Sequence, residues 1–95
     1  MATIAGTTRE RAEAIAAEAL GFIASDEARL ARFVALTGVD VAEIREHVRE
    51  PMFLAGVLDY LLEDEGLLGE FVEHAGLPPE APALARGALA ECLGR

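Results

Sequence analysis

Two pairs of glutamate and histidine have a spacing that could hold a metal ion. Glu43 and His47 lie four residues apart, and so do Glu70 and His74. In a helix this spacing places both side chains of a pair on one face, where they could share a metal. A catalytic zinc needs a third protein ligand, and neither pair has an obvious one nearby. We therefore interpret both as solvated surface pairs and predict no metal and no cofactor.

Asp59 is the one residue charged at neutral pH in the apolar stretch from Pro51 to Leu62. If its carboxylate is buried it needs a cationic partner, because an unpaired charge in a core is costly. An arginine from the first half of the chain, such as Arg32 or Arg45, would serve. In the alternative that we favour, Asp59 marks the one wet edge of this segment, continuous with Glu63.

The acidic residues of the second half form a candidate interaction surface. Residues 50–85 carry eight acids and no Lys or Arg, whereas residues 9–49 carry six Arg and eight acids. A surface of one sign attracts a partner of the opposite charge, which predicts a basic protein surface as the partner. The alternative is a solvated face without a partner. The candidate residues are Asp59, Glu63, Asp64, Glu65, Glu70 and Glu73.

Charge and composition argue against several other classes of function. The net charge of −9 disfavours nucleic acid and anionic membranes, which both need a cationic surface. The longest apolar stretch is too short to cross a bilayer, and the N-terminus lacks the order of a signal peptide, so we expect a cytoplasmic protein. We find no Ser/His/Asp or Cys/His arrangement and no phosphate-binding glycine loop. The sequence thus predicts no catalytic residue and no enzyme.

These residues are carried on six predicted helices, whose ends are marked by local signals. The expected start signals are Thr7 with Glu10, Asp26 with Glu27, the Asp40–Glu43 capping box, Pro51, Asp64 with Glu65, and the segment after Pro78–Pro79. Gly38 and Gly76 are predicted to end helices in the left-handed conformation.

The helical period also predicts which side chains point inward. They are Ile15, Ala19, Phe22 and Ile23; Leu30, Phe33, Val34 and Thr37; Val41, Ile44 and Val48; Leu67, Leu68, Phe71 and Val72; and Leu84, Leu89 and Leu93. The helix from Pro51 is apolar nearly all round, so we expect it to be central and buried.

An internal repeat organises these helices. Residues 17–38 align with residues 55–76, and eight aligned residues in the first segment are identical in the second: Ala17, Leu20, Asp26, Glu27, Leu30, Phe33, Val34 and Gly38. We predict one all-α domain over residues 7–94. It is expected to be a compact bundle of about six short helices, formed by two tandem three-helix repeats over about 9–50 and about 51–93.

The segments RLARFVALTGVDVAEIR (29–45) and MFLAGVLDYLLEDEGLLGEFVEHAGLPPE (52–80) resemble a family of small bacterial proteins, domain of unknown function 3572. The resemblance spans roughly residues 10–90. It implies a compact, all-helical, cytoplasmic bacterial protein. The family carries no assigned activity, so the resemblance transfers no functional residue.

The leading hypothesis is a non-enzymatic protein–protein interaction or regulatory module. It would act through the acidic second half or through apolar surface left on the helix from Pro51. One alternative is a structural homodimer. Another is a small ligand binder or enzyme with a pocket between the repeats, around Asp59, Tyr60 and His47.

Overall fold

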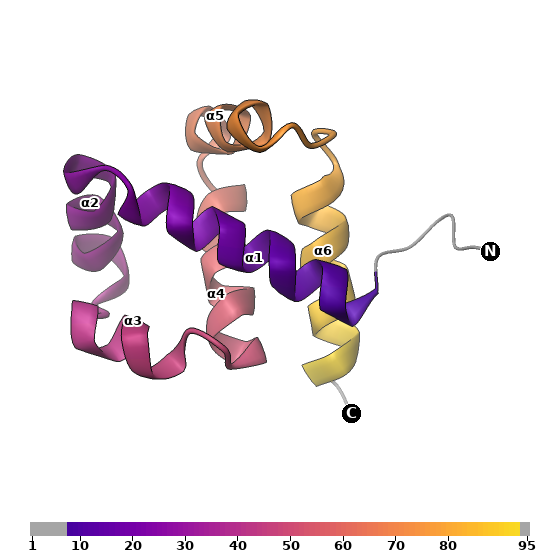
Figure 1. The fold of residues 1–95 in the computed structure, drawn as a ribbon, viewed down its shortest axis with the longest axis horizontal. Helices are drawn as coiled ribbons and strands as arrows, with labels where there is room; N and C mark the ends of the chain where they lie inside the picture. The colour runs from indigo at the N-terminus through magenta and orange to yellow at the C-terminus, as the bar shows by residue number, and fades with distance from the viewer. Residues whose placement is uncertain (1–7, 94–95) are drawn as a thin grey trace.

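The computed structural model describes residues 8–93, and within them the chain forms α-helices and no strand. The helices are α1 (Arg9–Ala24), α2 (Glu27–Thr37), α3 (Val41–His47), α4 (Pro51–Leu62), α5 (Glu65–Ala75) and α6 (Ala81–Leu93) (Figure 1). The predicted all-α bundle is confirmed. In the described part of the chain, no helix combines the length and the apolar character needed to span a membrane.

Side-chain caps begin four of the helices. The side chains of Thr8, Asp26, Asp40 and Asp64 each accept a hydrogen bond from a backbone N–H in the first turn that follows. This satisfies donors that a helix start leaves unpaired. The caps at Asp26 and Asp64 and the capping box from Asp40 are as predicted. Thr7, the predicted first cap, lies outside the described residues, and the cap of α1 is Thr8.

Glycines end α2 and α5 as expected. Gly38 and Gly76 have φ angles of 77° and 69°, in the left-handed region that side-chain-bearing residues avoid. Each glycine N–H donates to a carbonyl of the last helical turn. The chain therefore turns sharply between α2 and α3 and between α5 and α6 (Figure 1).

The core lies where α1, α4 and α6 pack against one another. Ala12, Ala16 and Ala19 of α1 and Ala85 of α6 are fully buried. Small side chains at a crossing let two helices approach closely. The larger core residues, among them Ile15, Ile23, Leu58, Leu61 and Leu89, fill the space around this crossing.

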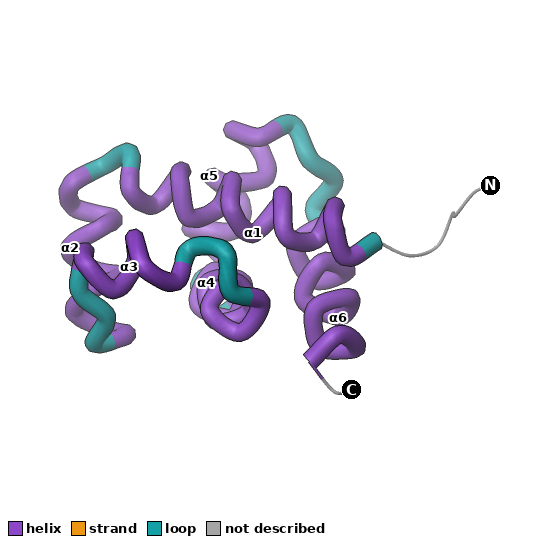
Figure 2. The backbone as a smooth tube through the Cα atoms, turned by 60° about the horizontal axis from the view of Figure 1, so that its bottom comes forward, coloured by secondary structure: helices purple, strands orange, loops and turns teal. Residues whose placement is uncertain are grey.

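The other helices lie around this centre. Figures 1 and 2 show α2 and α6 on opposite sides of α4, and α2 packs on α1 while α5 packs on α4 and α1. Aromatic contacts cross between the halves. The ring of Phe22 lies 5.7 Å from that of Phe71, and the ring of Phe33 lies 4.9 Å from that of Tyr60, centroid to centroid.

The bounds of the first two helices in each half correspond closely. α1 and α4 end at residues 24 and 62, and α2 and α5 span 27–37 and 65–75, so the boundaries are offset by 38 residues. The third helices differ, because α3 has seven residues with none buried, whereas α6 has 13 residues and buries Ala85 and Leu89. A repeat of three matched helices is therefore not confirmed.

Several predicted inward positions are wrong. Leu84 is 47% exposed because Pro82, Ala85 and Leu89 form the buried face of α6 instead. Val41 at the start of α3 is 48% exposed and Thr37 at the end of α2 is exposed, because α3 packs only lightly on the other helices, whereas α6 packs closely on α1 and α4. The side chain of Leu93 lies outside those described.

The expectation for α4 is correct on one side only. Leu54, Val57, Leu58 and Leu61 are buried, but Met52 is 72% exposed. α6 and α1 cover one side of α4, whereas α2 meets it without extensive contact. An apolar helix surface is thus left open on the side toward α2 and α3.

Candidate functional site

An apolar cleft lies between α2 and the N-terminal half of α4. Its volume is about 190 Å³, and its lining is Phe33, Thr37, Val39, Met52, Phe53, Gly56 and Val57. Phe33 forms a buried floor, whereas Met52 stands at the rim. Three of the four large apolar side chains that are exposed in the described structure, Leu36, Val41 and Met52, belong to α2, α3 and α4.

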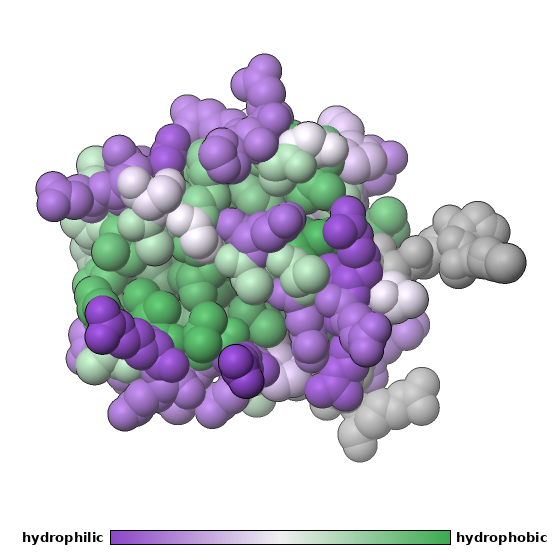
Figure 3. Space-filling view, viewed as in Figure 1, coloured by the Kyte–Doolittle hydropathy of each residue, from purple (hydrophilic) through white to green (hydrophobic). Residues whose placement is uncertain are grey.

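Hydrophobic side chains also dominate the face of the molecule over α2, α3 and α4 (Figure 3). Ile44 and Val48 pack against the core there but are only partly buried. The short α3 cannot cover this face, so apolar side chains remain in contact with water. A contiguous apolar surface of this kind is unusual unless something binds it.

An acidic cleft continues the same side of α4 toward its C-terminus. It has a volume of about 580 Å³ and is lined by Arg32, Leu36, Tyr60, Glu63, Asp64 and Glu65. The edge-on contact between Phe33 and Tyr60, with planes at 90°, joins it to the apolar cleft, since each ring lines one of the two. We call the linings of these two clefts together the α2–α4 surface.

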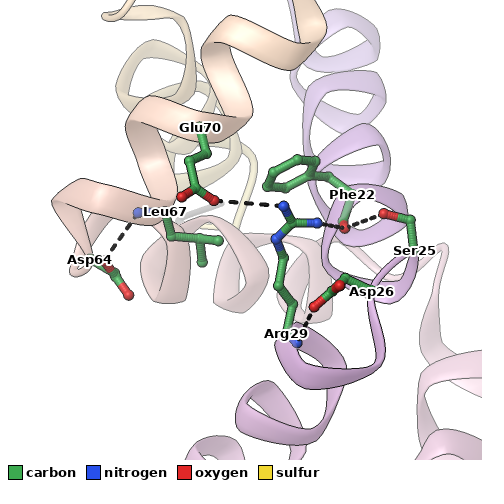
Figure 4. Close-up of polar contacts among 7 residues, drawn as sticks. All are labelled: Phe22, Ser25, Asp26, Arg29, Asp64, Leu67 and Glu70. Atoms are coloured by element: carbon green, nitrogen blue, oxygen red, sulfur yellow. Dashed lines mark hydrogen bonds and ion pairs between the residues drawn. The ribbon is translucent and has the colours of Figure 1, made fainter.

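Arginines from α2 reach the acidic residues of α5. The Arg29 guanidinium lies 4.0 Å from the centre of the Phe22 ring and 3.6 Å from a carboxylate oxygen of Glu70 (Figure 4). It also donates to the Phe22 carbonyl at 3.5 Å, the carbonyl that accepts from the Ser25 hydroxyl. Arg29 therefore ties α1, α2 and α5 together.

Arg32 lies 3.8 Å from Asp64, and its side chain is 67% exposed. Together with Arg29 it brings positive charge from the first half of the chain to the acidic second half. The surface charge around the acidic second half is therefore not of one sign in the folded protein, although the sequence of that half is. The exposed Arg32–Asp64 pair itself contributes little to stability.

The six predicted acidic residues are distributed over two adjoining clefts and the surface outside them. Glu63, Asp64 and Glu65 share the acidic cleft. Asp64 and Glu70 line a neighbouring cleft of about 260 Å³ with Arg29 and Arg32. Asp59 and Glu73 line neither of these clefts. Glu63, Asp64 and Glu65 thus line one cleft, and Glu70 lines the adjoining cleft that shares Asp64 with it.

Asp59 is paired, but not with a residue of the first half. Its two carboxylate oxygens accept from Nε and Nη2 of Arg86 in α6, at 2.7 and 3.2 Å. Arg32 and Arg45, the suggested partners for a buried Asp59, do not pair with it, because α6 packs closely against α4 whereas α2 and α3 do not. The Asp59 side chain is 51% exposed, as the wet-edge alternative predicts. The hydrogen bond to Asp59 raises the pKa of Arg86.

Neither glutamate–histidine pair forms the predicted i, i+4 contact. His47 Nδ1 lies 2.9 Å from Glu50 instead, and this hydrogen bond raises the pKa of His47 above the ordinary value of 6.5. Glu43 accepts from the backbone N–H of Asp40 in the capping box.

In the second pair, Glu70 faces Arg29, and the His74 ring lies 5.1 Å from that of Phe22. Among the side chains that the structure describes, no group of three from His, Cys, Asp or Glu is placed to hold a metal ion.

Sequence reasoning missed the apolar cleft and the role of Arg86. The cleft had one signal, since Met52 and Gly56 lie on the same face of α4 as Asp59, the edge predicted to be wet. Arg86 had another, because it is the first cation after Arg49 in a long acidic stretch. Neither signal identifies a partner without the packing of α4 against α6.

The fold and these clefts define a small six-helix protein with an open apolar side bordered by carboxylates. The chain belongs to the family described as protein of unknown function (DUF3572), whose model matches residues 9–92. This confirms the resemblance noted in the sequence. No curated protein and no solved structure matches the chain.

Proposed function

We propose that this protein is a non-enzymatic module that binds another protein through the α2–α4 surface. The observation that carries the proposal is the exposure of Met52, 72% accessible at the rim of a cleft with a mainly apolar lining. Burying such a side chain gains about 1.5–3 kcal/mol, a gain that a monomer leaves unused. The proposal keeps the cytoplasmic location that the sequence predicts.

The carboxylates beside the cleft support the same proposal. Glu63 and Glu65 are exposed, and neither has an ion-pair partner among the residues that the structure describes. Polar and charged residues around an apolar centre are the usual composition of a protein-binding surface. Their negative charge favours a partner with basic residues.

The two alternatives draw on other observations. A homodimer would bury the same apolar cleft, but it would bring two chains of net charge −9 together. A ligand-binding or catalytic pocket centred on Asp59 loses its main argument, because this carboxylate is half-exposed and bound by Arg86. We therefore place binding of a different protein first.

The test is capture of partners with matched variants. Full-length wild type, Met52→Glu and Leu84→Glu are immobilised and exposed to lysate of the source organism, at low and high salt. Leu84 is the control because it is an exposed leucine on α6, away from both clefts. Circular dichroism and thermal melting establish that all three are equally folded.

We expect a defined protein to be retained by wild type and Leu84→Glu and to be lost from Met52→Glu. Retention should weaken at high salt, because exposed charges are screened over about 10 Å or less above 0.1 M salt. If no protein distinguishes Met52→Glu from Leu84→Glu, the proposal is wrong. Light scattering on the same samples gives the molar mass and so tests the homodimer alternative.

A further inference from the structure

The α2–α4 surface changes from apolar to acidic along α4. At the N-terminal end, Met52, Phe53 and Gly56 line the apolar cleft. At the C-terminal end, Glu63 follows Tyr60 into the acidic cleft. The surface is therefore an elongated strip with two chemically different ends, and it does not have the form of an enclosed pocket for a small molecule.

We infer that the partner segment is an amphipathic α-helix, with apolar side chains near one end and Lys or Arg near the other. This inference rests on the proposed function and specifies the chemistry of its partner. Recognition of a helix in an apolar groove uses anchors at i, i+3, i+4 and i+7 spacing. The apolar cleft takes such anchors, and the carboxylates set the direction in which the helix lies.

The length of the strip fixes the spacing within the partner. Met52 and Glu63 are eleven positions apart on α4. At 1.5 Å per residue this separation is about 16 Å, or about three helical turns. A partner helix lying along α4 should therefore place its first basic residue about 10–12 positions from its main apolar anchor. A segment of about 16 residues is long enough to span both clefts.

Gly56 allows the partner to approach closely at the apolar end. It is exposed in the middle of α4, and a Cβ atom added there would meet no other atom within 4 Å. Packing within this chain therefore does not require glycine at this position, although glycine destabilises a helix relative to alanine. In the complex, the missing side chain gives the partner's anchors access to Phe33 and Val57 of the same cleft.

The charges favour a different protein over a second copy of this chain. Asp64 already caps α5 and lies near Arg32, so Glu63 and Glu65 are the carboxylates left for a partner. A second copy would bring its own net charge of −9 to this acidic end. A basic helix brings the complementary charge and is steered by it.

The experiment selects helices without assuming a partner. A displayed library of 16-residue helix-forming peptides is selected on the full chain and counter-selected on Gly56→Leu, whose side chain fills the apolar cleft. Thermal melting shows whether Gly56→Leu is folded, and Gly56→Ala with Met52→Glu replaces it if it is not. Affinities of the selected peptides are measured by fluorescence anisotropy at 20 and 300 mM salt.

Two double variants separate charge from shape. Glu63→Gln with Glu65→Gln removes the carboxylates of the acidic cleft, whereas Glu73→Gln with Glu80→Gln makes the same charge change outside both clefts. We expect selected peptides to carry apolar anchors and a basic residue about 10–12 positions away. The first double variant should weaken binding about three- to tenfold at 20 mM salt and less at 300 mM, and the second should not.

The inference is overturned if no peptide is enriched, if the enriched peptides lack basic residues, or if Gly56→Leu binds them as wild type does. Failure of the inference is distinguishable from failure of the proposed function. If capture of a protein depends on Met52 but the protein binds through a segment that is not an amphipathic helix, the proposed function is supported and the inference of a helical partner is wrong. If no protein is captured through Met52 and no peptide is selected, both the proposed function and the inference are wrong.

Discussion

The ring of Tyr60 meets the ring of Phe33 edge-on, with centroids 4.9 Å apart and planes at 90°. This contact joins α4 to α2 at the boundary between the apolar and the acidic cleft. The backbones of α2 and α4 do not pack closely together, so this side-chain contact is one of the links between the two helices. The pair therefore contributes to the shape of the α2–α4 surface where its two clefts meet.

A double-mutant cycle should detect this pair. We predict that Phe33→Leu and Tyr60→Leu interact by about 0.5–1.5 kcal/mol in the free energy of unfolding, the range for an aromatic pair beyond its buried area. Urea denaturation of the two single variants and the double variant gives the interaction energy. Strictly additive effects would show that the rings do not support each other.

Glycines inside the helices should be replaceable with a gain in stability. Cβ atoms at Gly69 and Gly87 would meet no other atom within 4 Å, so Gly69→Ala and Gly87→Ala should each raise the free energy of unfolding by about 0.5–1 kcal/mol. Gly38→Ala should lower it by about 1–2 kcal/mol, because φ is 77° there. A stabilising Gly38→Ala, measured by urea denaturation, would contradict the left-handed cap.

The Asp59–Arg86 ion pair should contribute modestly to stability. Asp59→Asn is predicted to lower the free energy of unfolding by about 0.2–1 kcal/mol, since the carboxylate is half-exposed. Glu73→Gln, an exposed acid with no such partner in the described structure, is the matched control and should change it less. If Asp59→Asn lowered the free energy of unfolding no more than Glu73→Gln does, the ion pair would not contribute to stability.

The His47–Glu50 contact predicts a pH dependence. The hydrogen bond to Glu50 raises the pKa of His47 above 6.5, so the folded state binds this proton more tightly than the unfolded chain does. The contribution to stability is fully present below pH 6.5 and is lost as the pH rises through the raised pKa of the folded state. NMR titration should show this pKa, and Glu50→Gln should lower it. A pKa of His47 that Glu50→Gln leaves unchanged would contradict the contact.

Local features of this fold follow from sequence because their causes are local. An aspartate accepts hydrogen bonds from N–H groups two or three residues away, so the caps at Asp26, Asp40 and Asp64 are legible without tertiary structure. The same holds for Gly38 and Gly76, where the backbone itself demands glycine.

Prediction of tertiary features fails where the helical period does not decide which side of a helix is buried. Periodicity shows that α4 and α6 are apolar, but the close alanine crossing with α1 decides which sides they bury. That choice leaves Met52 and Leu84 outside. It also brings Arg86 to Asp59 across 27 residues, a pairing that no local pattern specifies. The candidate site lies among these unpredictable contacts, so the sequence shows its acids but not its cleft.

The most direct measurement is site-specific photo-crosslinking in living cells of the source organism. A photoreactive amino acid replaces Met52 in one strain and Leu84 in another, and adducts are identified by mass spectrometry. The account predicts a discrete adduct with a different protein from position 52, absent from position 84 and lost when Gly56→Leu is added. An equal adduct from both positions, an adduct with a second copy of this chain alone, or no adduct from position 52 would contradict it.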